Sequence, residues 1–480
     1  MPIRRGEQFL EGLRDGRQVW LRGEKVDDVT THPALAGFAK SLAEIYDLQH
    51  DPAHQEQLTM KSPSTGDVVS LGYLLPHSTE DLIRVRHMTE FLQRRCGGVA
   101  ARLPHYMATM LVALYDLRDI LGQEDPAYKD NIVRFFEYCR EKDLCLTVAF
   151  GDPQRPQNRP STDFEFLKVV EHRPDGIVIR GCKPVATLAP YADEFLGLAA
   201  RPGHGVEEVI YFAIPLNTKG VRVICRQPFA PEDSKNHPLS AFWDEMDASI
   251  LFDDVFVPKD RIFYYQRVTP ENVPFLVQIF LWTLTWTFYH TQIRKVVKLE
   301  VLTGICKAMA DYLGTAGQSQ MQFSLSDFIV DIETLRALIQ AAETNPTASR
   351  SGLAEPNLTQ LMVAHIFSVG RHPQLLQIIR EVCGSGSLMA PGQHEMDNPE
   401  LSPEIYRYFV GKDEGAPDRF RMLRLAWEYS CESFGSRQLL FEMYNSGAPA
   451  QLKMRLVDSY DLSPYVRLAK ELAGIPTEEV

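Results

Sequence analysis

The hydrophobic periodicity of the chain changes twice, and this limits the folds that the chain can adopt. Between residues 144 and 263 the apolar residues gather in short runs rich in β-branched and aromatic side chains, several of them closed by Gly, Pro or Asn. No segment of helical length separates the runs. This favours an antiparallel barrel or sandwich over a parallel sheet with crossover helices. The runs lie at residues 144–150, 176–181, 209–214, 221–225 and 248–252.

The regions on both sides of these runs are predicted to be helical. On the N-terminal side, the string His77-Ser-Thr-Glu-Asp begins a helix with Ser or Thr as its N-cap and acids in its first turn. On the C-terminal side, four long periodic segments predict a helical bundle. They lie at residues 277–313, 324–342, 358–382 and 417–444.

We therefore expect an α+β chain made of three domains and a tail. An N-terminal helical domain (1–142) precedes a central antiparallel β domain (143–268) and a C-terminal four-helix bundle (269–447). The tail (448–480) is predicted to be irregular, with one short helix near 465–473. This order resembles the acyl-CoA dehydrogenase-like flavoproteins, in which the flavin lies between the β domain and the bundle.

Charge and cysteine content exclude several classes of partner. The 480 residues include 50 Lys and Arg against 63 Asp and Glu, a formal net charge of −13. Nucleic acids and anionic membranes are bound by clustered positive charge, so neither is expected as a partner. No apolar stretch reaches about 18 residues, and no signal-peptide core is visible at the start. Eight cysteines without a C-x-x-C pair predict reduced thiols, no metal site and a cytoplasmic location.

The common short motifs of nucleotide-binding and hydrolytic enzymes are absent. No G-x-G-x-x-G opens a helix after a strand, and neither G-x-S-x-G nor H-E-x-x-H occurs. The glycine-rich string that begins at Gly384 follows a predicted helix, so it is a poor phosphate-binding loop.

Longer strings give the chain a family resemblance. They include Arg180-Gly-Cys-Lys-Pro-Val-Ala-Thr-Leu-Ala-Pro-Tyr-Ala-Asp-Glu and Phe434-Gly-Ser-Arg-Gln-Leu-Leu-Phe-Glu-Met-Tyr. From about residue 5 to residue 450, the chain resembles the 4-hydroxyphenylacetate 3-hydroxylase family, the oxygenase components of two-component flavin monooxygenases. The other strings lie at 13–20, 28–34, 46–52, 244–258 and 384–389.

The resemblance implies an activity and its partners. A separate NAD(P)H:flavin reductase would supply reduced FAD, which would react with O2 to form a flavin hydroperoxide. The enzyme would then hydroxylate a phenolic or related aromatic substrate, free or carrier-bound, ortho to its hydroxyl. The family resemblance also implies a homotetramer.

Three residues are the candidates for catalysis. Arg102 and Tyr106, in Arg-Leu-Pro-His-Tyr, match the family's Arg-x-Pro-x-Tyr substrate motif. A guanidinium beside the phenol oxygen favours phenolate, and a tyrosine hydroxyl can donate a hydrogen bond to it. His290 matches a histidine that acts as base in chlorophenol- and nitrophenol-oxidising relatives, and a reference pKa near 6.5 suits that task. The alternative is that all three residues are structural. Arg102 would then pair with an acidic residue, Tyr106 would fill a gap in the packing, and His290 would be a buried core residue.

The remaining site residues come from the resemblance, with one departure. Val148 replaces a family histidine that helps to bind the phenol oxygen, which makes 4-hydroxyphenylacetate itself a poor expected substrate. Arg201 and Pro202 match a mobile substrate lid, for which a plain hairpin is the alternative. The residues matching flavin contacts are Val148, Ala149, Phe150, Gln154, Arg155, Pro156, Gln157, Thr187, Tyr444, Asn445, Ser446 and Gly447.

Two other functions remain open at this point. One is an acyl-CoA dehydrogenase or dehydratase without an iron–sulfur cluster, because the three-Cys, one-His ligand set of 4-hydroxybutyryl-CoA dehydratase is missing around Cys96 and His290. That chemistry needs a catalytic carboxylate in the bundle. Glu300 is the only tempting acid, and its neighbours Arg294 and Lys298 suggest ion pairing instead. The other is a non-catalytic scaffold, which the intact motif residues disfavour.

Overall fold

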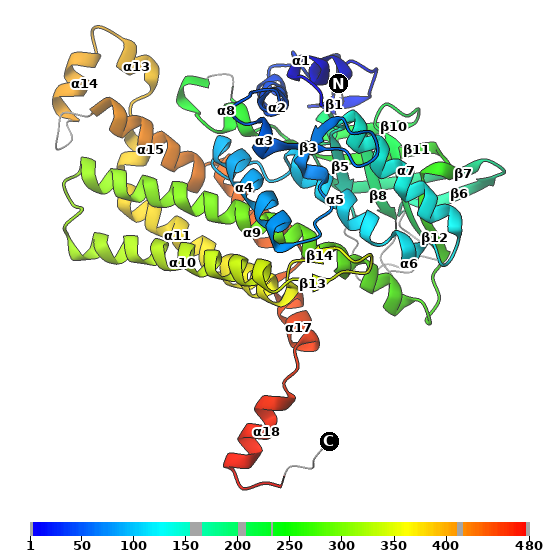
Figure 1. Cartoon of the computed structure of the whole chain (residues 1–480). Helices are drawn as coiled ribbons and strands as arrows, with labels where there is room; N and C mark the ends of the chain where they lie inside the picture. Colours follow the sequence, from blue (N-terminus) through cyan, green and yellow to red (C-terminus); the bar gives the residue numbers. More distant parts are fainter. Residues whose placement is uncertain (1–2, 154–165, 200–207, 232–233, 410–415, 477–480) are drawn as a thin grey trace, which may run out of the picture.

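The structure is a computed structural model that describes residues 3–153, 166–199, 208–231, 234–409 and 416–476. The described residues form helices toward both ends of the chain, two larger sheets between them, and two two-stranded sheets, β3 Thr59–Lys61 with β4 Val68–Ser70 and β13 Thr347–Ala348 with β14 Ala354–Glu355 (Figure 1). This is the predicted α+β order.

Helices dominate the N-terminal region. Ser78 caps α4, its side chain accepting from the backbone N–H of Asp81, as the sequence predicts. Pro104 starts α5 and Pro126 starts α7, positions that tolerate the missing N–H. The elements are α1 Gly6–Gly12, β1 Val19–Leu21, β2 Glu24–Val26, α2 Ala36–Leu48, α3 Gln55–Leu58, β3 Thr59–Lys61, β4 Val68–Ser70, α4 Thr79–Arg95, α5 Pro104–Asp116, α6 Arg118–Leu121 and α7 Pro126–Lys142.

The central region forms a six-stranded sheet, in the order β2-β1-β10-β11-β7-β6, and a four-stranded sheet, in the order β12-β9-β8-β5. Most neighbours are antiparallel, as predicted, but β1 pairs with β10 and β5 pairs with β8 in parallel. The elements are β5 Leu146–Ala149, β6 Lys168–Arg173, β7 Gly176–Thr187, β8 Glu194–Ala199, β9 Glu208–Pro215, β10 Val221–Cys225, α8 Ser240–Trp243, β11 Asp247–Pro258 and β12 Ile262–Arg267.

The C-terminal region is built around α9, a helix of 40 residues that packs against α10, α11 and α15 and also against α4 and α5. Such a helix is about 60 Å long. Figure 1 shows α9, α10 and α11 side by side at one end of the molecule. The elements are α9 Val273–Tyr312, α10 Ser319–Thr344, β13 Thr347–Ala348, β14 Ala354–Glu355, α11 Leu358–Cys383, α12 Gly386–Met389, α13 Gln393–Asp397, α14 Ser402–Tyr408, α15 Ala416–Ser430, α16 Ser433–Tyr444, α17 Pro449–Ser459 and α18 Ser463–Leu472.

Two details of the prediction were wrong, and one needs an addition. The region 1–142 is mostly helical, as predicted, but β1 and β2 in it extend the six-stranded sheet. The expected helix at 417–444 is two helices, α15 and α16. They approach so closely that a Cβ on Gly435 would lie 2.7 Å from the carbonyl oxygen of Glu428. The tail carries two helices, α17 and α18, instead of one. The domain boundaries themselves stay a prediction.

Candidate active site

A cavity of about 940 Å³ lies between the sheets and the helices. Strands β5, β7 and β9 line one side of it, α5 and α9 the other, and α16 with the start of α17 its edge. Its size suits a cofactor ring together with a small aromatic molecule. The predicted site residues in its lining are Arg102, Tyr106, Val148, Ala149, Phe150, Thr187, Tyr444, Asn445, Ser446 and Gly447.

Arg102 presents a cation to this cavity. It precedes α5, and its guanidinium carbon lies 4.3 Å from the ring centroid of Tyr106 and 5.5 Å from that of Phe441. Its backbone N–H donates to Glu245 Oε2 at 2.9 Å, which fixes the main chain. Among the described residues, no carboxylate pairs with the Arg102 guanidinium, so its charge is available to a ligand.

A buried ion-pair network closes the cavity beside Arg102. Arg437 of α16 donates to both carboxylate oxygens of Asp247 at 2.7 and 2.9 Å and to Glu245 Oε1 at 2.8 Å. Although burial opposes ionisation, the guanidiniums of Arg437 and Arg226 hold the pKa of Asp247 well below its usual range. Asp247 also lies opposite Thr187 in the β11–β7 pairing, and its Oδ1 accepts a hydrogen bond from the Thr187 hydroxyl at 2.7 Å.

The helix α16 ends in the segment from Tyr444 to Gly447, which the sequence predicts as a flavin contact. All four residues line the cavity. Gly447 has φ +106°, a backbone conformation that side chains disfavour, and this lets the chain turn into α17 at the cavity edge.

One polar atom of the cavity wall has no partner in the described part of the chain. The hydroxyl of Tyr211 on β9 is buried there without a hydrogen-bond partner. A buried hydroxyl of this kind normally finds a partner. Together with the apolar wall at Val148 and Leu276, it fits a planar heterocycle with polar edges, such as a flavin.

Comparison with known proteins agrees with this geometry. The family models of the 4-hydroxyphenylacetate 3-hydroxylase N terminal and C terminal regions match residues 5–264 and 281–474. The chain belongs to the 4-hydroxyphenylacetate 3-hydroxylase family. The predicted family and its acyl-CoA dehydrogenase-like fold are thereby confirmed.

Named relatives span nearly the whole chain. The oxygenase component of the 4-nitrophenol 4-monooxygenase/4-nitrocatechol 2-monooxygenase of Rhodococcus opacus is 34% identical over 99% of this chain and 92% of its own. The probable 4-hydroxyphenylacetate 3-monooxygenase of Bacillus subtilis (strain 168) is 30% identical over 100% of both. The crystal structure of the oxygenase component of 4-hydroxyphenylacetate 3-monooxygenase, complexed with FAD and 4-hydroxyphenylacetate, superposes with a TM-score of 0.90. It is 28% identical and covers 98% of this chain and 99% of that one.

His290 does not reach the cavity in the described structure. It lies 3% exposed on α9 behind Tyr106, with the two rings edge to face at 6.1 Å. Its Nδ1 lies 3.2 Å from the Thr89 hydroxyl and its Nε2 2.8 Å from the Thr109 hydroxyl. Burial lowers the pKa of His290 to about 3, so the ring is neutral at physiological pH. Both nitrogens are occupied, which leaves none for a substrate proton.

Glu300 is also remote from the cavity lining of the described structure. Its carboxylate pairs with Arg94 at 3.0 Å and with Arg336 at 2.8 Å. The expectation of ion pairing is confirmed, but the partners are other residues than the expected Arg294 and Lys298, which bind Glu442.

Cys96 has the environment of an inert thiol. It is fully buried, and burial raises its pKa to about 11. Its sulfur contacts oxygens of Gln93 and Ala100, and all eight cysteines are free.

The sequence missed several groups of the site and could not place others. Tyr211, Tyr264 and Thr283 line the cavity but carry no motif. Of the predicted residues, Gln154, Arg155, Pro156, Gln157, Arg201 and Pro202 lie outside the described residues. No described helix is long and apolar enough to cross a bilayer.

Proposed function

We propose that this chain is the oxygenase component of a two-component monooxygenase that uses reduced FAD and O2 to hydroxylate a phenolic substrate ortho to its hydroxyl. The observation that supports this most directly is the guanidinium of Arg102, which lines the cavity beside Tyr106 and pairs with no carboxylate of the described residues. Family membership and the FAD-bound relative support the reaction class. When bound, reduced FAD supplies the activation of oxygen.

Arg102 and Tyr106 hold the phenol. Positive charge beside the phenol oxygen stabilises phenolate, which is the more electron-rich ring. The Tyr106 hydroxyl donates a hydrogen bond to the same oxygen. With both groups on one oxygen, the ring orientation is fixed before oxygen transfer.

His290 is assigned a positioning role instead of the role of base. Thr89 donates its proton to the carbonyl oxygen of Val85, so it accepts from Nδ1–H. The Thr109 hydroxyl lies 2.8 Å from Nε2 and 3.2 Å from the carbonyl oxygen of His105, and we assign its one proton to the nearer acceptor, Nε2. This fixed neutral ring packs edge to face with the Tyr106 ring and so helps to hold Tyr106 in place. His290 therefore does not accept the phenol proton. The substrate either loses that proton to another group or enters the cavity already as phenolate.

The substrate is proposed to be a phenol acidic enough to bind as phenolate. Val148 gives the cavity wall an apolar surface where a histidine would offer a hydrogen bond. A nitrophenol or a halogenated phenol suits such a wall better than 4-hydroxyphenylacetate does. The names of the Rhodococcus opacus relative and of a 2,4,6-trichlorophenol monooxygenase of Cupriavidus pinatubonensis agree with this choice.

The proposal includes a partner protein and an oligomeric state. A separate NAD(P)H:flavin reductase supplies reduced FAD, and the free thiols agree with a cytoplasmic setting. Large apolar side chains stand exposed on the outer face of α10 at Phe323, Ile329 and Val330. Such a face supports a homotetramer with the bundles at its centre. Light scattering at micromolar concentration tests this, and a monomer would contradict it.

The experiment that tests the function combines the pure chain with a flavin reductase, NADH and 4-nitrophenol. We expect oxygen uptake with formation of the catechol, tighter binding of reduced than of oxidised FAD, and no NADH oxidation by the chain alone. Robust NADH consumption without the reductase would refute the two-component assignment. Acyl-CoA oxidation without phenol hydroxylation would favour the dehydrogenase alternative.

A further inference from the structure

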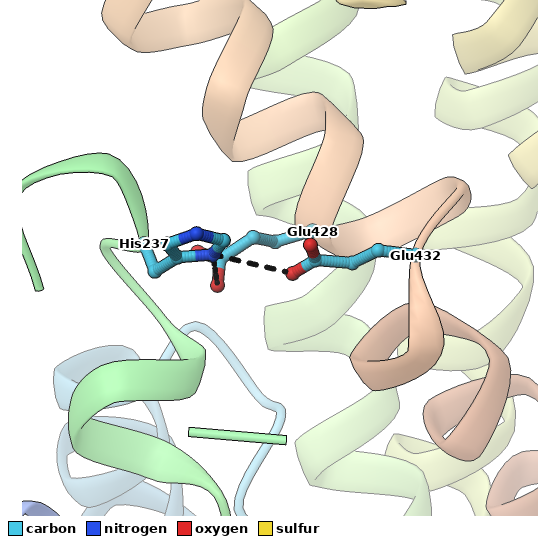
Figure 2. Close-up of side chains that lie close together, drawn as sticks. All are labelled: His237, Glu428 and Glu432. Carbon is cyan, nitrogen blue, oxygen red and sulfur yellow. Dashed lines mark ion pairs between the residues drawn. The ribbon is translucent and has the colours of Figure 1, made fainter. Parts of the chain in front are cut away.

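A second group of potential ligands lies where the β10–β11 connection meets the bundle. His237 in that connection faces Glu428, near the end of α15, and Glu432, the N-cap residue of α16 (Figure 2). The three ligand atoms lie within 4.8 Å of one another. This group is separate from the residues that line the cavity.

The distances from His237 to the two carboxylates suit ligands of one ion. His237 Nδ1 lies 3.6 Å from Glu428 Oε1 and 3.7 Å from Glu432 Oε1. Both separations are longer than a hydrogen bond. Two ligands at about 2.1 Å from one tetrahedral ion lie roughly 3.4 Å apart. His237 Nδ1 is buried and has no hydrogen-bond partner among the described residues.

The surroundings hold the ligands in place and leave an approach for an ion. Glu428 is 1% exposed, and its Oε2 accepts from the Leu239 N–H at 2.6 Å, while Oε1 accepts from Ser240. Such hydrogen bonds orient a ligating carboxylate. His237 and Glu432 are 28% and 20% exposed, so water can fill a remaining coordination position.

We propose that His237, Glu428 and Glu432 form a binding site for a divalent transition-metal ion, with Zn²⁺ as the best match. One imidazole and two carboxylates are ligands that Zn²⁺ takes, with water as the fourth. The ion would fasten the β10–β11 connection to the junction of α15 and α16.

This fastening would act on the cavity through two chain segments. From Glu432, α16 continues to Arg437 and the cavity edge. From His237, the connection continues to Glu245 and Asp247, which pair with Arg437. The metal site and this ion-pair network therefore hold the same two segments together at two places.

The test uses the full-length chain, freed of any histidine tag and dialysed against EDTA, titrated with ZnCl2 by isothermal calorimetry. We expect one Zn²⁺ per chain and a Zn²⁺-dependent rise in Tm. Glu432→Gln and His237→Gln should each weaken the affinity at least about tenfold. His87→Ala, which removes an exposed histidine of α4, should leave it unchanged.

Cobalt provides a second readout, because Co²⁺ bound to a nitrogen and oxygen ligand set of low coordination number gives a visible absorption band. The band should form with the parent and with His87→Ala but not with Glu432→Gln. Melting curves in EDTA show that each variant is folded. If the parent does not bind one metal ion per chain, or if Glu432→Gln binds the ion as tightly as the parent, the proposal is overturned. The cluster would then be an ion pair of a protonated His237 with two carboxylates.

Discussion

Replacing Arg102 by alanine should abolish the preference of the site for phenolate. The guanidinium faces the cavity without a carboxylate partner among the described residues, so a bound phenolate would be its counter-charge. A hydrogen bond to a charged group contributes about 1.5–3 kcal/mol. At 1.36 kcal/mol per pKa unit, its loss should raise the pKa of the bound phenol by roughly 1–2 units.

The assay uses 4-nitrophenol, whose phenolate is yellow. Titrating the bound ligand with pH in the absence of reductase reports its pKa directly. We expect the parent to lower that pKa relative to free 4-nitrophenol, Arg102→Ala to restore it and Arg102→Lys to lie between them. Arg84→Ala is the matched control, because Arg84 lies on the exposed face of α4 and pairs with Asp81. The same bound pKa in Arg102→Ala and in the parent would refute the assignment.

Four further outcomes follow from the structure. His290→Gln should lower the yield of hydroxylated product per NADH, because Tyr106 loses its support. The curve of this yield against pH should keep its shape from about pH 6 to 9, since the pKa of His290 is about 3 and the residue does not titrate in that range. A histidine with a depressed pKa destabilises the fold as pH falls below its unfolded value, so the Tm of this variant should drop less between about pH 7 and 4 than that of the parent. Val148→His should lower the KM for 4-hydroxyphenylacetate about tenfold, which steady-state kinetics would show. Asp247→Asn should cost about 1.5–3 kcal/mol in denaturant unfolding and weaken FAD binding, because Arg437 keeps Glu245 but loses one of its two carboxylate partners. Phe323→Asp should shift light scattering toward smaller species if α10 is an interface.

Long periodic segments were predictable because local signals and burial agree in them. The segment 358–382 coincides with α11, which Asn357 caps through the Thr359 N–H. The break between α15 and α16 was missed because it depends on the close approach of two helices at Gly435. The strands β1 and β2 are three residues each, too short for a period of two to stand out.

The site was predictable where a motif carries the chemistry and not where tertiary contacts decide the role. Arg102 and Tyr106 lie at the cavity as their motif indicates. His290 was identified by a family match, but its role is set by Thr89 and Thr109, which are 201 and 181 residues away in the sequence. No pattern along α9 reveals that pairing.

The two arginines beside the cavity have different roles: Arg437 stabilises the structure, and Arg102 is the one that can bind an anionic ligand. Arg437 is 8% exposed and fully compensated by Asp247 and Glu245, so it holds α16 against β11 and offers no net charge to a ligand. Glu245 also binds the backbone N–H of Arg102, which positions that residue without neutralising its side chain. The same acidic residue therefore fixes both arginines, and within the described ranges only the Arg437 charge is neutralised by carboxylates. Phenolate binding should consequently depend on Arg102, whereas the integrity of the cavity edge should depend on Arg437.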